Sequence, residues 1–122
     1  MKQFRFENLT IWQDSIEIAD KMLDIADKVS NERFYRFAEQ LRGAALSISN
    51  NIAEGSGSFS DKDFGNYLVI ARKSLFECAN MLIIFERRKL IDYNIRMELF
   101  SRLLVLSSQI TNFRKTLLKI KK

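Results

Sequence analysis

The strongest periodic pattern in the chain lies in FGNYLVIARKSLFECANMLIIF, residues 64–85. Its apolar residues are spaced three or four positions apart without exception, at Phe64, Leu68, Ala71, Leu75, Cys78, Leu82 and Phe85. This spacing repeats with the turn of an α-helix and places those side chains on one face. The pattern predicts a helix over residues 61–88, with Ser60 accepting a hydrogen bond from the first amides.

Three further segments show the same helical spacing, at residues 10–29, 32–54 and 93–120. Residues that commonly cap helices stand at their starts, namely Asn8 or Thr10, Ser30 or Asn31, and Asp92 or Asn94. The second helix is expected to end near Gly55, because glycine tolerates the left-handed conformation that closes many helices. Gly-Ser-Gly-Ser at residues 55–58 is then the clearest loop.

The composition agrees with a fold built from long helices. The chain has 122 residues, 47% of them hydrophobic, and it contains four glycines and no proline. Few residues are therefore available for the tight turns of a sheet-rich fold. Because the connections between the four segments are short, successive helices should run antiparallel. We expect residues 1–122 to form a single domain, an all-α, antiparallel up-down-up-down four-helix bundle.

The residue inventory also excludes several functions. The chain has no histidine and its one cysteine is Cys78, which rules out histidine-dependent hydrolases, the usual zinc sites and an internal disulfide. We expect no enzyme activity, no metal and no cofactor. Cys78 lies on an apolar helix face and should be a core residue. No segment has the pattern of a signal peptide or a membrane span, which predicts a cytoplasmic protein.

Charge is distributed unevenly along the chain. The net charge of +5 divides into −2 over residues 1–30, zero over 31–60, +2 over 61–91 and +5 over 92–122, the last part having seven basic and two acidic residues. The candidate nucleic-acid-binding residues are Arg87, Arg88, Lys89, Arg114, Lys115, Lys119, Lys121 and Lys122. Two other interpretations stay open: the cations stabilise helix C-termini, or they bind an acidic protein.

A polar stripe accompanies the apolar face of the second helix. Gln40, Ser47, Asn51 and Glu54 lie at helical spacings. We favour the interpretation that these side chains hydrogen-bond to neighbouring helices and fix their register, because a buried polar group without a partner costs ~1–3 kcal/mol. A ligand pocket near Gly55 and a stripe that faces solvent are the alternatives.

Residues 40–57, QLRGAALSISNNIAEGSG, resemble the signature of the bacterial four helix bundle protein family. The first described members of that family are encoded by intervening sequences within large-subunit ribosomal RNA genes. Further agreement occurs at Leu9, Trp12, Gln13, Phe64, Leu68, Ala71, Ser74, Leu75 and Glu77. The chain departs from the pattern at Gly43 and Lys73, where arginine and glycine are frequent.

The resemblance implies a four-helix protomer that assembles into a ring-like homopentamer. It also implies a relationship to the basic accessory proteins of diversity-generating retroelements, which bind a reverse transcriptase and for which nucleic-acid contact has been suggested. The family has no established enzymatic activity. The polar and structural residues of interest in its motifs are Gln40, Arg42, Ser47, Asn51, Glu54, Gly55 and Glu77. We expect Glu54 and Glu77 to form ion pairs with Arg42 or Arg72 rather than an acid–base pair.

These observations favour a non-catalytic, oligomeric helical scaffold that engages RNA, or a reverse-transcriptase-like protein that handles nucleic acid, through basic residues of the last two helices. The alternative is a protein–protein adaptor with no nucleic-acid role. Self-association is expected because large apolar residues lie outside the helix seams. They are Tyr35, Phe59, Tyr67, Phe76, Ile84, Tyr93 and Phe100.

Overall fold

The computed structural model describes residues 2–120, and in that part of the chain it contains helices and no strand. A short 3-10 helix, η1 (Arg5–Asn8), precedes four α-helices. These are α1 (Thr10–Asn31), α2 (Tyr35–Ser56), α3 (Asp61–Arg87) and α4 (Tyr93–Leu117). The all-α, four-helix fold expected from the periodic patterns is confirmed.

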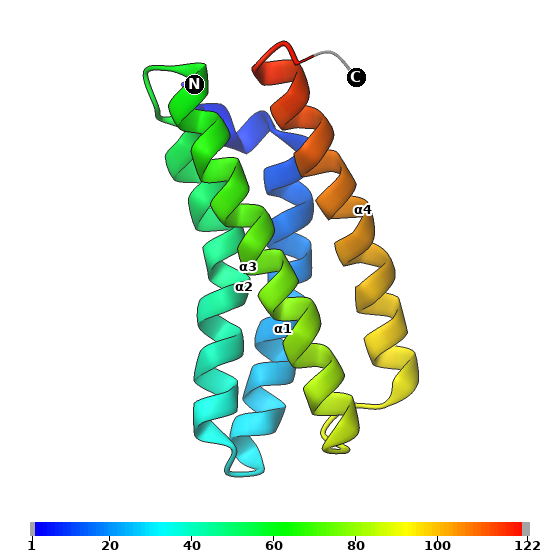
Figure 1. The fold of residues 1–122 in the computed structure, drawn as a ribbon. Coiled ribbons are helices and arrows are strands. Elements are labelled where there is room, and N and C mark those ends of the chain that lie inside the picture. The colour runs from blue at the N-terminus through cyan, green and yellow to red at the C-terminus, as the bar shows by residue number, and fades with distance from the viewer. Residues whose placement is uncertain (1, 121–122) are drawn as a thin grey trace.

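The four helices form one elongated bundle (Figure 1). The colour gradient reverses direction from each helix to the next, so that α2 and α4 end where α1 and α3 begin. Each helix packs side by side with two others, in the cyclic order α1, α2, α3, α4, and in the described residues the backbones of the diagonal pairs α1–α3 and α2–α4 do not approach each other closely. The connections of three to five residues require this arrangement, since they are too short to cross the bundle.

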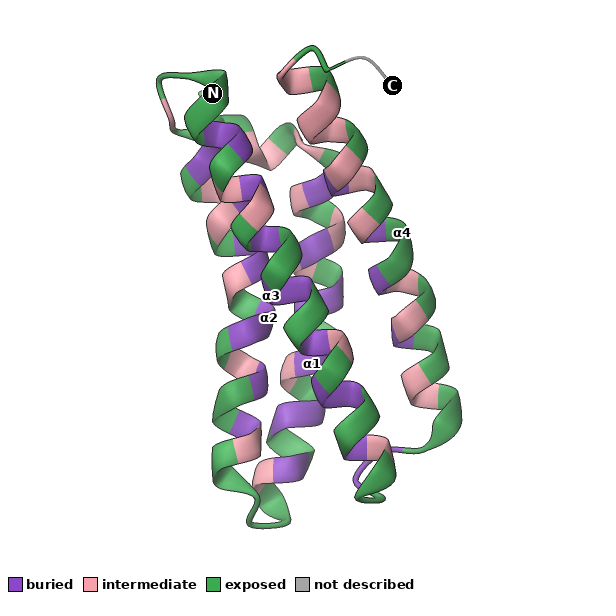
Figure 2. Ribbon diagram, viewed as in Figure 1, coloured by how far each residue is buried: buried purple, intermediate pink, exposed green. Residues whose placement is uncertain are grey.

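The periodic face of α3 lies at the centre of the core. All of its pattern residues, from Phe64 to Phe85, are at most 3% exposed. Figure 2 shows the buried positions of α1, α2 and α3 turned towards one another, whereas α4 carries more exposed and half-buried positions. Cys78 is fully buried, as expected, and burial raises the pKa of its thiol to about 12. A buried, protonated thiol of this kind behaves as a small apolar side chain.

Two of the expected helix caps are present and two are not. The amide of Asp63 donates to Ser60 Oγ across 3.1 Å, and the amide of Ile95 donates to Asp92 Oδ1 across 2.8 Å. The caps expected for the first two helices are wrong. Leu9 and Phe34 hold the positions before α1 and α2, and neither makes a side-chain capping bond.

The connection between α1 and α2 also differs from the prediction. Ser30 and Asn31 belong to α1, and the chain turns at Arg33, whose φ is 70°. The same left-handed conformation occurs at Lys89 and Lys119, two residues beyond the ends of α3 and α4. At each of these ends the following amide donates to a carbonyl five residues earlier, as in the glycine-terminated helix motif. Lysine here adopts a conformation that usually favours glycine.

The second helix ends near Gly55, as expected, but Gly55 does not adopt the left-handed conformation predicted for it. The structure continues α2 to Ser56, and Gly55 is a buried helical residue. A Cβ atom at this position would lie 2.7 Å from both Phe64 Cδ1 and Tyr67 Cβ of α3. Gly55 therefore allows α2 and α3 to approach each other, and the connection consists of residues 57–60. The flexible loop predicted at residues 55–58 is correspondingly shifted.

Candidate nucleic-acid interface

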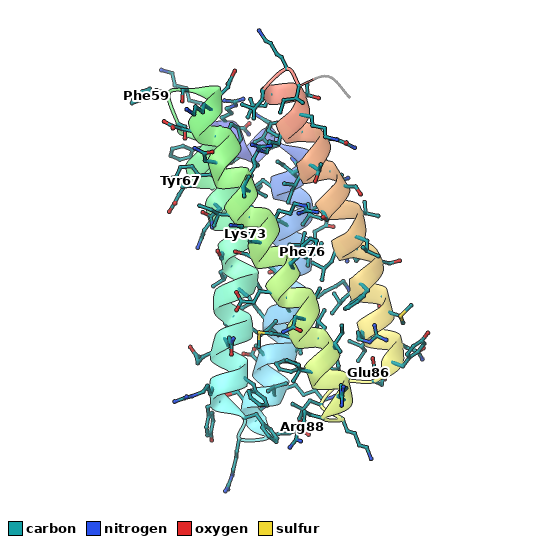
Figure 3. All side chains as sticks on the ribbon, in the orientation of Figure 1. Phe59, Tyr67, Lys73, Phe76, Glu86 and Arg88 are labelled. Atoms are coloured by element: carbon teal, nitrogen blue, oxygen red, sulfur yellow. The ribbon has the colours of Figure 1, made fainter. Side chains whose placement is uncertain are left out.

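The candidate basic residues lie at opposite ends of the bundle, as helices of alternating direction require. Arg87 is the last residue of α3, Arg88 and Lys89 follow it, and Figure 3 shows Arg88 at the end opposite to Phe59. Arg114, Lys115 and Lys119 lie at the other end, at the C-terminus of α4. A helix of 25 residues is about 37 Å long at 1.5 Å per residue, so one protomer cannot combine both groups in one small site. Lys121 and Lys122 lie outside the described residues.

The surroundings of the two groups differ in charge. Near the end of α3, Lys89 shares a surface hollow with the carboxylates of Glu86 and Asp92. Glu86 is itself ion-paired with Arg96 of α4. The hollow is also lined by Lys28, so it combines two lysines with Asp92 and the ion-paired Glu86, and its charge is mixed.

A groove between α3 and α4 has the opposite character. It encloses about 250 Å³ and is lined by Leu68, Val69, Arg72, Lys73, Ile110, Thr111, Arg114 and Lys115. Arg72 and Lys73 come from α3, and Arg114 and Lys115 come from α4; we call these four residues the groove cations. No carboxylate belongs to this described lining. The sequence explains why, since α3 has no acidic residue between Asp63 and Glu77 and the chain has none after Glu98.

The groove cations are not neutralised within the protomer. All ion pairs in the described residues involve Lys21, Arg42, Arg96 or Arg102, and none involves a groove cation. Arg114 Nε donates to the carbonyl oxygen of Gly65 across 3.2 Å, and the Arg72 guanidinium lies 4.6 Å from the centre of the Phe76 ring. Both contacts hold the side chains in place and leave their positive charge uncompensated.

An apolar hollow adjoins the groove along the same α3–α4 seam. It encloses about 110 Å³ and is lined by Leu75, Phe76, Ala79, Phe100, Leu103, Leu104 and Ser107. Phe76 follows Arg72 by four residues on α3, and Ser107 precedes Thr111 by four residues on α4, so the two hollows are about one helical turn apart. Phe76 is 53% exposed and Leu104 is 66% exposed. Figure 3 shows Phe76 on the side of α3 that faces α4.

Sequence reasoning identified Arg114 and Lys115 but missed Arg72 and Lys73 as members of this site. Arg72 was expected to be an ion-pair partner, and Lys73 was noted only as a departure from a family pattern. The available signal was the presence of two Arg-Lys pairs, at residues 72–73 and 114–115, on helices predicted to be neighbours.

The polar stripe of α2 does not act as one unit. Ser47 Oγ and Ser74 Oγ of α3 share a hydrogen bond of 2.8 Å. Asn51 Nδ2 donates to the carbonyl oxygen and to the Oγ of Ser47, across 2.7 and 2.9 Å. Gln40 and Glu54 are exposed and take part in no such network within the described residues. The interhelix contact therefore rests on Ser47 and Ser74.

The ion pairs expected for Glu54 and Glu77 are wrong. Arg42 binds Asp27 of α1 across 2.8 Å and Glu39 of its own helix across 2.5 Å. Glu54 is twelve residues beyond Arg42 on α2, which is about 18 Å along the helix and out of reach. Arg72 lies over Phe76 instead of pairing with either glutamate.

The apolar residues expected outside the core are mostly at the surface. Tyr67 and Phe100 are half-buried, and the exposed members are Tyr35, Phe59, Phe76, Ile84 and Tyr93. The described residues contain no group of three or more histidine, cysteine, aspartate or glutamate side chains placed to hold a metal ion. None of the described helices combines the length and the apolar character needed to span a membrane.

Comparison with known proteins identifies a matching family model and a solved structure with a similar fold. The family model described as 23S rRNA-intervening sequence protein matches residues 7–112. A crystal structure of a protein of unknown function from the S23 ribosomal protein family of Bacteroides thetaiotaomicron, at 1.70 Å resolution, is similar with a TM-score of 0.83. That match covers 87% of this chain and 99% of the other, at 21% sequence identity, and shows the fold alone. No curated protein matches the chain significantly.

Proposed function

This chain belongs to the 23S rRNA-intervening sequence protein family, and from that premise we propose that it is a non-catalytic helical scaffold that binds RNA through the groove cations. One observation carries the proposal: Arg72, Lys73, Arg114 and Lys115 line one groove that has no carboxylate in its described lining. The RNA backbone carries closely spaced phosphate groups. A row of cations on a rigid surface can bind these phosphates whatever the base sequence.

The rigid placement of the cations favours this role. Arg72 and Lys73 are near the middle of α3, and Arg114 is tied to α3 by its bond to Gly65. Cations on packed helices lose less conformational entropy on binding than cations on a loop. Arginine also donates in a fork that matches two phosphate oxygens.

Self-association is the second part of the proposal. Each copy contributes a charge of +5, so assembly of several copies, as in a pentamer, concentrates positive charge on one particle. Exposed apolar residues on α3 and α4 support such assembly, Ile83, Ile84 and Val105 among them. Polyanion binding then gains from contacts made by more than one copy.

The proposal is tested with two matched double variants. Arg72→Gln with Lys73→Gln should weaken binding of mixed-sequence RNA by about tenfold or more at ~50 mM salt, because two phosphate contacts are lost. Arg87→Gln with Arg88→Gln removes the same charge at the other end and should have a smaller effect. Equal effects of the two double variants would assign binding to net charge and not to the groove.

A protein–protein adaptor is the alternative function. The observation that favours it is the apolar hollow beside Phe76 and Leu104, which resembles the surface that a partner helix covers. The two functions separate in the same assay, because an adaptor of this kind does not bind RNA even at ~50 mM salt.

A further inference from the structure

The α3–α4 seam combines a basic groove with an exposed aromatic side chain. The groove cations line one hollow, and the half-exposed ring of Phe76 lines the next. Phe76 is about 5.4 Å along α3 from Arg72, which is one helical turn. An exposed aromatic ring beside a basic groove is the arrangement that single-stranded nucleic acids use, because bases stack on the ring while the backbone follows the cations.

We infer that the seam binds unpaired RNA, with the backbone on the groove cations and a base stacked on Phe76. This inference rests on the proposed function and adds the strand type and a base contact to it. A duplex keeps the faces of its bases inside the helical stack, so Phe76 could contribute nothing to duplex binding. A single strand exposes both the phosphates and the base faces along one short path.

The contacts around Phe76 fit a stacking platform. The Arg72 guanidinium lies 4.6 Å from the ring centre and so covers part of the ring, yet 53% of the side chain is exposed. The neighbouring hollow is apolar except for the hydroxyl of Ser107, and its remaining lining includes Phe100 and Leu104. A base at this place would contact Phe76 on one face and apolar side chains at its edge. Arg72 would serve both contacts, since it can hold a phosphate and polarise the ring.

The size of the groove also favours a single strand. The basic groove encloses about 250 Å³ and the apolar hollow about 110 Å³, and both lie between two packed helices. Helix axes in contact are ~8–10 Å apart, so the seam is narrower than a nucleic-acid duplex. Duplex RNA could touch the outermost cations without entering the groove.

Phe76 is tested by substitutions that separate stacking from apolar contact. Phe76→Leu keeps an apolar side chain and removes the aromatic ring, and it should weaken binding of a mixed-sequence single-stranded RNA by about tenfold. Phe76→Trp should retain the affinity. Phe59→Leu is the matched control, because Phe59 is fully exposed in the connection before α3 and away from the seam. It should bind as the unsubstituted protein does.

The strand preference is measured with a hairpin duplex of the same base composition. The protein should bind the single strand about tenfold more tightly than the duplex, and Phe76→Leu should remove most of that difference while leaving duplex binding unchanged. Quenching of the added indole in Phe76→Trp by the single strand, and not by the duplex, would report the stacking directly. Trp12 is the one native tryptophan, and Phe76→Leu supplies its background signal.

Three outcomes would overturn the inference. Equal affinity for strand and duplex, with Phe76→Leu unchanged, would show backbone binding alone and would leave the proposed function intact. A change of particle mass in Phe76→Leu, measured by light scattering, would assign the ring to an interface between copies. Absence of binding to either RNA at ~50 mM salt would remove the proposed function itself, and the inference with it.

Discussion

Arg114 of α4 is joined to Gly65 of α3 by a hydrogen bond from its Nε to the carbonyl oxygen, across 3.2 Å. The two helices approach closely here. A Cβ atom on Gly65 would lie only 3.1 Å from Cδ1 of Leu118, the residue after α4. The bond fixes one groove cation against the helix that supplies two others. Arg114 therefore has a structural contact that its neighbour Lys115 lacks.

Substitution of these two neighbours should separate stability from binding. Arg114→Gln is expected to lower the free energy of unfolding by about 1 kcal/mol, because a hydrogen bond of a charged group is lost, and also to weaken RNA binding. Lys115→Gln should weaken RNA binding with stability unchanged. Urea denaturation and fluorescence anisotropy measure the two effects. Equal losses of stability would contradict a structural role specific to Arg114.

Gly55 and Gly43 should respond in opposite directions to the same substitution. Gly55→Ala is expected to destabilise the protein by about 1–3 kcal/mol, because the new Cβ would lie 2.7 Å from Phe64 and Tyr67. Gly43→Ala should stabilise it by about 0.5–1 kcal/mol, since this helical glycine is exposed and no atom lies within 4 Å of the added group. Thermal unfolding followed by circular dichroism checks both. A neutral Gly55→Ala would show that α2 and α3 can move apart at little cost.

Replacing Lys89 with glycine should stabilise the protein. Its φ of 62° is strained for a residue with a side chain, so Lys89→Gly is expected to raise the free energy of unfolding by about 0.5–1 kcal/mol. Lys73→Gly removes the same charge from the interior of α3 and should lower it by about 1 kcal/mol. The difference between the two variants isolates the backbone effect from the charge. A destabilised Lys89→Gly would argue that the lysine side chain itself supports the turn.

Cys78 should make stability depend on pH above the ordinary range of a thiol. Its pKa is raised to about 12 in the folded protein by burial, whereas an unfolded thiol titrates near 8.5. The unfolded state therefore loses its proton first, and the contribution of the thiol to stability is complete below about pH 8.5 and declines as the pH rises towards 12.

Urea denaturation between about pH 8 and 11 measures this dependence, with a limiting slope of about 1.4 kcal/mol per pH unit from the thiol. Cys78→Ala is the control, since its slope lacks the thiol contribution. Identical slopes for the two proteins would mean that the thiol is not desolvated in solution. Alkylation should likewise require unfolding, because the buried group is neither ionised nor accessible.

The sequence was informative wherever a structural feature depends on residues close together in the chain. The face from Phe64 to Phe85 could be predicted because the spacing within one helix determines which side chains share a face. The caps at Ser60 and Asp92 could be predicted for the same reason, since each bonds an amide three residues away.

Features that depend on packing between helices were harder to predict from the sequence. Gly55 looked like a helix end, and its actual role becomes visible only once Phe64 of α3 is placed against it. The groove was missed for a similar reason, because Arg72 and Lys115 are far apart in sequence and the relative shift of α3 and α4 brings them together. Periodicity fixes the faces of helices but not how far one helix is displaced along its neighbour.

The salt dependence of RNA binding tests the central claim most directly. Binding of mixed-sequence RNA is measured between about 50 and 200 mM salt for the protein and for a variant with glutamine at all four groove cations. With about four phosphates neutralised, the logarithm of the binding constant should fall with the logarithm of salt concentration with a slope near −3, and the variant should lose most of that slope. Equal slopes for the two proteins, or no binding at ~50 mM salt, would contradict the assignment of the groove as the RNA site.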